Sequence, residues 1–275
     1  NKTSTAQKGI GYKIKNMTDT NMLLTITIVI FFLMYIGAIV FQGEGFLRPQ
    51  TFLSMLNANG ALIITSCGMS LVMITGGIDI SVGGVVALVS MCSAVYLDYH
   101  NGSILGAVLI SLGIGLAFGI VQGYLVAYLD IQPFIVSLAG MFFARGMTTI
   151  VNTNPFNGQN EAFVALKDTR VIVPGLGSVN KLGRYVDAYV EIGVVVALLV
   201  VILMFIMLRW TKLGRSFYAV GGKQQIALML GINVRRTKML SHLICSLLAG
   251  IGGFVYFIHV GTGSASQAMG KEINT

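Results

Sequence analysis

Charged residues are scarce in this chain. Asp, Glu, Lys and Arg make up only 10% of the 275 residues, whereas 55% are hydrophobic and the mean hydropathy is +0.81. A soluble domain usually carries about a quarter charged residues, which coat its surface. So few charges exclude an ordinary water-soluble fold, and the apolar excess indicates helices that contact lipid as well as one another.

The chain also lacks the motifs of enzymes and nucleotide-binding proteins. Its three cysteines have no paired spacing, so neither a disulfide framework nor a zinc site is predicted. Its three histidines are scattered, and no paired carboxylates occur in the apolar runs. The nearest approach to a phosphate-binding loop, Gly270-Lys271, fails because Ala265 replaces the first glycine and Glu272 the hydroxyl residue. We therefore expect no enzyme activity, no metal and no cofactor in this chain.

Acidic residues are missing from one long basic segment. Residues 209–238 contain Arg209, Lys212, Arg215, Lys223, Arg235, Arg236 and Lys238. Four more lysines precede the first apolar run. Basic clusters beside apolar spans follow the positive-inside rule, and no nucleic-acid-binding motif accompanies them. We predict that residues 1–21 and 209–238 lie in the cytoplasm, and we expect no nucleic-acid partner.

Apolar runs long enough to cross a bilayer recur along the chain. A spanning helix needs about 20 apolar residues. The qualifying segments are 22–41, 51–78, 80–97, 99–129, 133–150, 188–208 and 239–260. Residues 151–187 are polar and rich in Asn, Gly and Pro, which predicts an external loop. The predicted fold is one all-α transmembrane domain, residues 1–275, in which glycine-broken stretches are either full spans or half-helices.

The segment 75–84 (TGGIDISVGG) places a carboxylate between two apolar runs. Such a charge is costly unless it reaches water, a helix N-terminus or a partner. Asp79 and Ser81 can each accept backbone N–H bonds at the start of the following helix. The glycines permit sharp turns or close packing, and they include Gly76, Gly77 and Gly83. We favour a structural cap over a substrate contact, and both readings stay open.

Within the basic segment, a run of helix-forming residues is bounded by glycines. It follows Gly221-Gly222 and precedes Gly231, which predicts a short helix that stops at Gly231. The run consists of Lys223, Gln224, Gln225, Ile226, Ala227, Leu228, Met229 and Leu230. Its large apolar side chains are unsuited to a solvated loop. They must be buried by a partner protein or by the membrane interface, and the residues alone leave both open.

Three segments together resemble one family. TGGIDISVGG resembles the signature of sugar permeases of the ribose, galactose and arabinose ABC importers. Residues 134–146 (FIVSLAGMFFARG) are similar to the segment that follows a proline-led helix start in those permeases, with the galactofuranose permeases as the nearest match in wording. Residues 213–234 (LGRSFYAVGGKQQIALMLGINV) are similar to their cytoplasmic loop, in which a short coupling helix contacts the ATPase.

The resemblance implies a type II-like importer permease in the bacterial cytoplasmic membrane. Two permease subunits, identical or not, would enclose an alternating-access pathway. A separate ATPase would hold ATP and Mg²⁺, and an extracytoplasmic binding protein would deliver the sugar. The helix at 223–231 is assigned to ATPase docking and Gly221-Gly222 to its hinge or turn. Asp79 and Arg145 are candidates for fixing broken helices or for lining the pathway.

Such permeases continue with further spans beyond the point that matches Met269–Ile273, so we expect this chain to be an incomplete portion. Two other functions remain open. An ion-coupled secondary transporter would need buried carboxylates, often in inverted repeats, and Asp79 is the one acidic residue that interrupts the long apolar runs at 51–97. ABC permeases for nucleosides or signalling molecules share the same motifs, so the sequence does not identify the solute.

Overall fold

The structure, a computed structural model, describes residues 19–42, 48–179 and 185–263. Seven helices in these ranges are long and apolar enough to cross a membrane. They are α2 (Asp19–Gln42), α3 (Pro49–Ile74), α4 (Val82–Tyr99), α5 (Ile104–Ala127), α6 (Pro133–Val151), α8 (Ile192–Trp210) and α11 (Val234–Val260). The predicted polytopic helical bundle is confirmed. The lysines at positions 2–15 and residues 269–273 lie outside the described residues.

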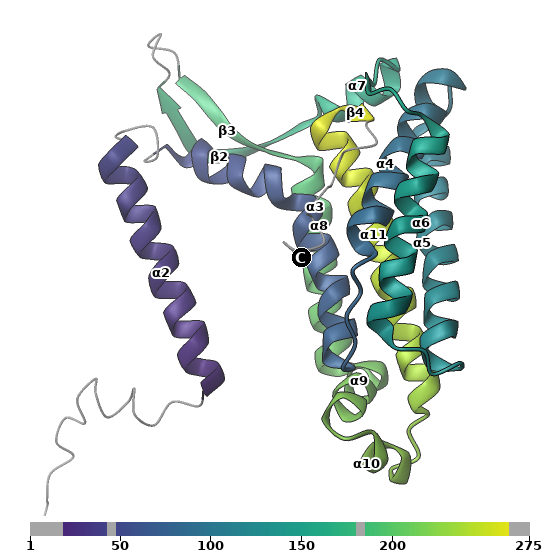
Figure 1. The fold of residues 1–275 in the computed structure, drawn as a ribbon. Coiled ribbons are helices and arrows are strands. Elements are labelled where there is room, and N and C mark those ends of the chain that lie inside the picture. The colour runs from purple at the N-terminus through teal and green to yellow at the C-terminus, as the bar shows by residue number, and fades with distance from the viewer. Residues whose placement is uncertain (1–18, 43–47, 180–184, 264–275) are drawn as a thin grey trace, which may run out of the picture.

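Six of these helices form one bundle, and α11 runs through its centre (Figure 1). Helix α2 stands apart, and no part of its spanning segment is buried (Figure 1). Its exposed apolar side chains include Leu23, Phe31, Leu33 and Met34. Because a helix that is apolar all round is stable only when lipid or protein surrounds it, α2 presents surface for the bilayer or for another chain.

Small residues let α5 lie directly against α11. A Cβ atom added at Gly119 would lie 2.8 Å from the Cα atom of Leu243, and one at Gly115 would lie 2.6 Å from the carbonyl oxygen of Ser246. Distances this short leave no room for a side chain, so the glycines allow the two backbones to approach. Gly115 and Gly119 are therefore helix-packing positions.

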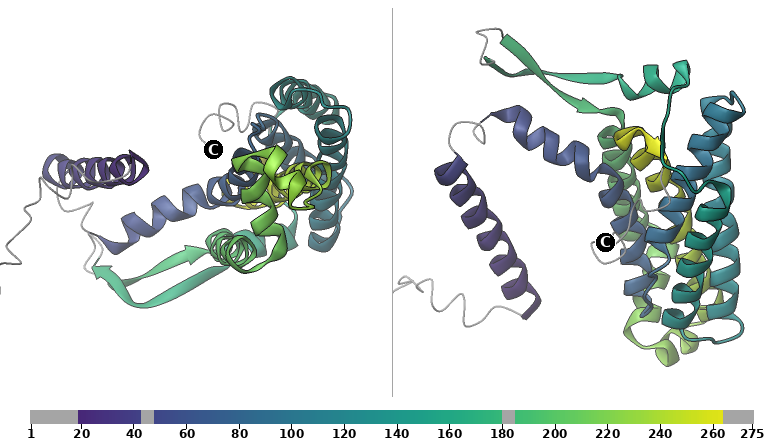
Figure 2. Two further views of the ribbon diagram at one scale, coloured as in Figure 1. Left: turned by 90° about the horizontal axis from the view of Figure 1, so that it is seen from below. Right: turned by 45° about the horizontal axis from the view of Figure 1, so that its top comes forward.

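Short strands and one helix cover one end of the bundle. These elements are β1 (Phe156–Asn157), α7 (Glu161–Lys167), β2 (Arg170–Val179), β3 (Tyr185–Glu191) and β4 (Thr262–Gly263). Strands β2 and β3 pair antiparallel and project over the start of α3 as a hairpin (Figure 2). The predicted external loop at 151–187 contains these short elements, because β-branched and aromatic residues favour paired strands despite the neighbouring glycines. Residues 188–191 likewise belong to β3 and not to a span.

The opposite end of the bundle holds two short helices, α9 (Lys212–Gly222) and α10 (Gln224–Met229) (Figure 1). Helix α9 was not predicted. It begins where the Thr211 hydroxyl accepts a hydrogen bond from the Gly214 amide, and it buries Phe217 and Val220. Helix α11 begins at Val234, earlier than predicted. The basic residues at 235, 236 and 238 therefore lie in its first turns and not in a loop.

Candidate functional site

A left-handed glycine ends α3 at the start of the signature segment. Gly76 has φ +84°, a conformation that only glycine adopts without cost. Its amide donates to the Met73 carbonyl, and the Gly77 amide donates to the Val72 carbonyl, at 3.0 and 2.9 Å. These two bonds form a Schellman motif, which satisfies the last carbonyls of the helix. Gly76 thus redirects the chain back toward the bundle.

Residues 75–81, which connect α3 to α4, are here called the signature loop. The loop runs back along the bundle, so that α4 starts inside the bundle (Figure 1). The polar side chains of the loop point inward. Thr75 is 4% exposed, and Asp79 and Ser81 are fully buried. By contrast, the side chain of Ile78 is 49% exposed, and that of Met73, near the end of α3, is 60% exposed. The loop therefore has a polar inner side, and Ile78 points outward beside Met73 of α3.

A chain of hydrogen bonds holds Asp79 to its own turn and to α5. The Ser81 amide and hydroxyl both donate to Oδ1 of Asp79, at 3.0 and 2.6 Å. The buried Gln122 amide group on α5 donates to the Ser81 hydroxyl at 2.9 Å. Asp79 thus binds Ser81, the residue just before α4, and not an amide of the helix itself. The predicted cap by Ser81 was wrong, because its hydroxyl is engaged by Asp79 and Gln122 and caps no helix amide.

Helix α11 closes the inner side of the signature loop. The hydroxyls of Thr75 and Ser241 lie 3.1 Å apart, and Nδ1 of His242 lies 3.9 Å from Oδ2 of Asp79. His242 is only 2% exposed. A carboxylate enclosed in this way stabilises the start of α4 and is closed to a solute within this chain. Burial therefore favours the structural reading of Asp79 over a pathway contact.

Helix α6 packs against the other glycines of the segment. A Cβ atom at Gly77 would lie 3.5 Å from Cβ of Pro133, the first residue of α6. One at Gly84 would lie 3.0 Å from the Met141 carbonyl oxygen, and Gly83 is buried beside it. Arg145 is half-buried on α6, about 18 Å along the helix from Pro133 at 1.5 Å per residue. Arg145 therefore lies in the second half of α6, far from the contact between Pro133 and Gly77.

The short helix of the basic segment is confirmed, together with its stop. Helix α10 ends at Met229, and Gly231 has φ +76°. The Ile232 amide donates to the Ala227 carbonyl and the Gly231 amide to the Leu228 carbonyl, both at 3.0 Å. This is a second Schellman motif, and it again requires glycine at the left-handed position.

Only one side chain of α10 is buried. Ala227 is fully buried in a small cluster with Val220 of α9 and Val234 of α11. The other apolar side chains of the segment point away, with exposed fractions of 52–86%, and they are Ile226, Leu228, Met229 and Leu230. Ala227 was grouped with the ATPase-coupling residues, but it positions α10 on the rest of the chain and is not on the exposed face.

Gly221 of the basic segment packs against Ile74, the residue just before the signature loop. A Cβ atom at Gly221 would overlap the carbonyl oxygen of Ile74, the last residue of α3. Its neighbour Gly222 has open space around the same position. Both glycines are the last helical residues of α9, so the predicted turn begins one residue later, and the hinge at Gly221-Gly222 stays a prediction. Gly221 is a close-packing position, and the chain leaves the helix at the extended residue Lys223.

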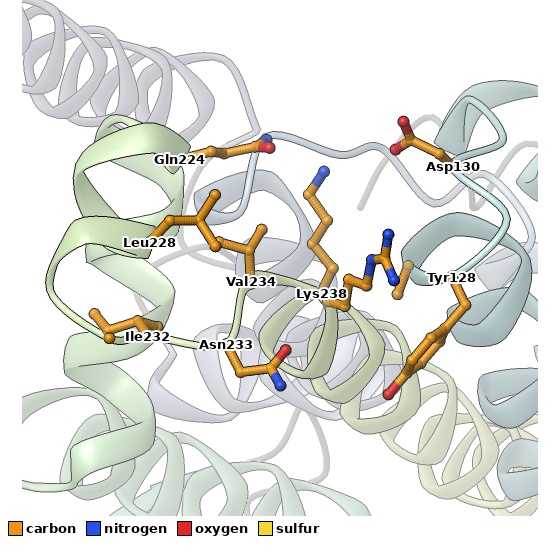
Figure 3. Close-up of a pocket in the computed structure, with 11 residues that line it drawn as sticks. Tyr128, Asp130, Gln224, Leu228, Ile232, Asn233, Val234 and Lys238 are labelled. Carbon is orange, nitrogen blue, oxygen red and sulfur yellow. The ribbon is translucent and has the colours of Figure 1, made fainter.

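A groove of about 660 Å³ lies between α10 and the turn that connects α5 to α6. Figure 3 shows Leu228 and Gln224 on the α10 side and Tyr128 and Asp130 on the side of the turn. Lys238, from the first turns of α11, extends into the space between the two walls (Figure 3). The groove therefore has walls of mixed apolar and polar side chains, with the cation Lys238 between them.

Comparison with known proteins identifies relatives over nearly the whole chain. The chain is 32% identical to the fructose import permease protein FruG of Bifidobacterium longum, over 99% of this chain and 78% of that protein. It is 32% identical to the inner membrane ABC transporter permease protein YjfF of Escherichia coli, over 94% of this chain and 74% of that protein. It is 28% identical to the ribose import permease protein RbsC of Escherichia coli, over 88% and 72%.

These relatives confirm the resemblance to sugar permeases of ABC importers, while the finer likeness to galactofuranose permeases stays a prediction. No solved structure gives a significant match. The model of one protein family, described as the permease component of branched-chain amino acid transport systems, matches residues 51–275. The match includes the signature loop, α10 and the groove beside it. The chain therefore belongs to this family of permease components and is a membrane-spanning subunit of an ABC transporter.

Proposed function

We propose that this permease subunit imports a sugar as part of an ATP-driven importer of the ribose, galactose or arabinose type. The names of its relatives support a sugar, since one is a fructose and another a ribose import permease. The same names speak against the ion-coupled alternative. The pathway would lie between two permease subunits, and the exposed side chains of Met73 and Ile78 supply surface for the second one.

The observation that carries the coupling assignment is the exposed apolar face of α10. Successive helix residues are about 100° apart, so Met229, which is 86% exposed, points away from the buried Ala227, with Ile226 and Leu228 on either flank. Helix α10 lies beyond the ends of the spanning helices (Figure 1). A partner protein in water can cover this face, whereas a bilayer at the level of the helix ends cannot. We assign the face to a separate ATPase that holds ATP and Mg²⁺.

Contacts within the chain support a route from α10 to the signature loop. Ala227 anchors α10 to α9 through Val220, and α9 meets the end of α3 through Gly221 and Ile74. The signature loop follows directly and fixes the start of α4 through Asp79. Movement of α10 by the ATPase would thereby change the position of the loop that separates α3 from α4.

The remaining assignments follow from the two ends of the bundle. The basic residues gather at the α10 end, so we place that end and the N-terminus in the cytoplasm by the positive-inside rule. The hairpin end then faces outward, where an extracytoplasmic sugar-binding protein would deliver its ligand. The membrane would be the bacterial cytoplasmic membrane.

Substitution of Met229 tests the coupling assignment. Met229→Asp should release the ATPase because it places a desolvated carboxylate at the contact, while the permease stays folded because Met229 makes little contact within the chain. Met229→Leu, which keeps the face apolar, is the control and should retain the ATPase. Co-purification and sugar-stimulated ATP hydrolysis are the measurements. Normal co-purification of Met229→Asp would place α10 elsewhere than on the ATPase.

The solute is tested with the complete importer in liposomes. Uptake of labelled ribose, galactose and fructose is compared with that of a nucleoside, at the same concentration of binding protein. Saturable, ATP-dependent uptake of one of the sugars is expected. Uptake of the nucleoside alone would contradict the sugar assignment while leaving the permease assignment in place.

A further inference from the structure

The turn between α5 and α6, residues 128–132, forms the second wall of the groove beside α10. Its apolar side chains are exposed: Tyr128 is 41% exposed, Leu129 54% and Ile131 37%. Asp130 has φ +56°, and the Ile131 amide donates to the Leu125 carbonyl at 3.2 Å. The turn is thus short and hydrogen bonded back to α5, and it exposes apolar side chains on both sides of Asp130.

This turn and α10 are exposed at the same end of the bundle, on opposite sides of one groove (Figure 3). Leu228 supplies apolar surface from α10 and Tyr128 from the turn. Exposed apolar surface is unfavourable by roughly 25 cal/mol per Å². A single partner that buries both walls would therefore lower the free energy more than one that buries either wall alone. A partner that reaches only α10 would leave Leu129 and Ile131 uncovered.

The charge of the groove indicates which side chains a partner protein needs there. Arg235 and Lys238 line it from α11, and Asp130 supplies a single carboxylate from the turn. The surrounding segment 209–238 adds further basic residues and contains no acidic one. Complementary charge directs association and fixes orientation. A partner that fills the groove therefore needs acidic side chains beside apolar ones.

Both walls of the groove lead to the signature loop by separate contacts. The α10 wall reaches it through α9, where Gly221 meets Ile74. The wall formed by the turn reaches it through Pro133, the first residue of α6, which lies against Gly77. An object seated in the groove would therefore act on the two ends of the short stretch from Ile74 to Gly77.

We propose that the α5–α6 turn is a second docking element for the ATPase. The groove between the turn and α10 takes an amphipathic segment of that ATPase, with apolar side chains against Tyr128 and Leu228 and an acidic side chain near Arg235 and Lys238. This inference rests on the proposed function, because it assumes that an ATPase docks on α10. It adds a contact surface that α10 alone does not provide.

Leu129→Asp tests the second element, with Ile172→Asp as its matched control. Leu129 and Ile172 are 54% and 60% exposed, and Ile172 lies on the hairpin at the opposite end. We expect Leu129→Asp to weaken ATPase binding about tenfold or more, because Leu129 adjoins the groove residue Tyr128 on the proposed contact, and Ile172→Asp to leave it unchanged. Binding is measured by titrating the ATPase onto the full-length permease in nanodiscs, and folding by thermal unfolding.

The charge requirement has its own measurement. Arg235→Glu should weaken ATPase binding and flatten its dependence on salt, because salt screens an attraction that the variant no longer has. A photo-crosslinking residue, Leu129→p-benzoylphenylalanine, keeps the site apolar and reports its neighbour even if Leu129→Asp fails to fold. A crosslink to the ATPase is expected.

The outcomes separate the two proposals. If Met229→Asp releases the ATPase while Leu129→Asp binds it normally, the second docking element is wrong and the proposed function stands. If both variants bind it normally, the coupling assignment of α10 falls as well. A crosslink from position 129 to lipid alone would place the turn in the membrane interface and overturn the inference.

Discussion

Oδ2 of Asp79 and Nδ1 of His242 face each other across 3.9 Å inside the bundle. Neither atom has a hydrogen-bond partner in the described part of the chain. Oδ1 of the same carboxylate, by contrast, accepts two hydrogen bonds from Ser81. Ser81 therefore holds the carboxylate through Oδ1, while Oδ2 faces α11. An approach of about 1 Å would complete a charge-assisted hydrogen bond between them.

Replacing Asp79 separates its acceptor role from its charge. Asp79→Ala removes the acceptor for two buried donors of Ser81 and should lower the free energy of unfolding by about 2 kcal/mol or more. Asp79→Asn keeps an oxygen at the same place and should cost less. Thermal unfolding of the purified permease measures both. A fully stable Asp79→Ala variant with an altered choice of sugar would contradict the structural role.

Gly221 and Gly222 form a matched pair of adjacent positions. Gly221→Ala forces a methyl group into the Ile74 carbonyl and should cost roughly 1–3 kcal/mol by overpacking, with a loss of transport. Gly222→Ala meets open space and should be neutral or slightly stabilising. Thermal unfolding and transport are compared for the two variants. Equal behaviour would show that the contact between α9 and α3 is not close in the working protein.

The packing of α5 on α11 allows a similar comparison. A Cβ atom at Gly119 would lie 2.8 Å from the Leu243 backbone, whereas Gly113 on the same helix has nothing within 4 Å. Gly119→Ala should therefore destabilise the bundle, and Gly113→Ala should raise helix stability by up to about 1 kcal/mol. The melting temperatures should move in opposite directions. A rise for both would mean that α5 and α11 lie farther apart.

The orientation in the membrane follows from two exposed positions at opposite ends of the bundle. Tyr185→Cys on the hairpin should react with a membrane-impermeant maleimide in cells whose cytoplasmic membrane is intact. Lys223→Cys, just before α10, should react only after the membrane is opened. Maleimide labelling followed by mass shift measures both. Reaction of Lys223→Cys in intact cells would reverse the orientation.

Much of the fold could be predicted because its signals are local. A run of about 20 apolar residues is sufficient to indicate a span, and all seven predicted runs coincide with helices in the described residues. The stop of α10 at Gly231 was also predictable, since a glycine after a run of helix formers is a common end signal. The need of Asp79 for hydrogen-bond partners was also predictable, since a charge among apolar residues is costly without them.

The remaining features depend on partners that are distant in the sequence. Ser81 was expected to cap α4, but its hydroxyl bonds to Gln122 of another helix. The close packing of Gly221 against Ile74 could not be predicted, because the two residues are far apart in the sequence. Helix α9 was missed because Phe217 and Val220 are interspersed with charges and glycines. In each case a tertiary contact decided between local alternatives that were nearly equal.

The contact between Gly221 and Ile74 joins two backbones by their van der Waals surfaces. Surfaces in such contact resist compression strongly, but they separate under tension with little resistance. Phe217 of α9 also lies in one apolar cluster with Leu71 and Ile74 of α3, so separating the two helices would expose apolar surface and α9 should carry the end of α3 with it in both directions.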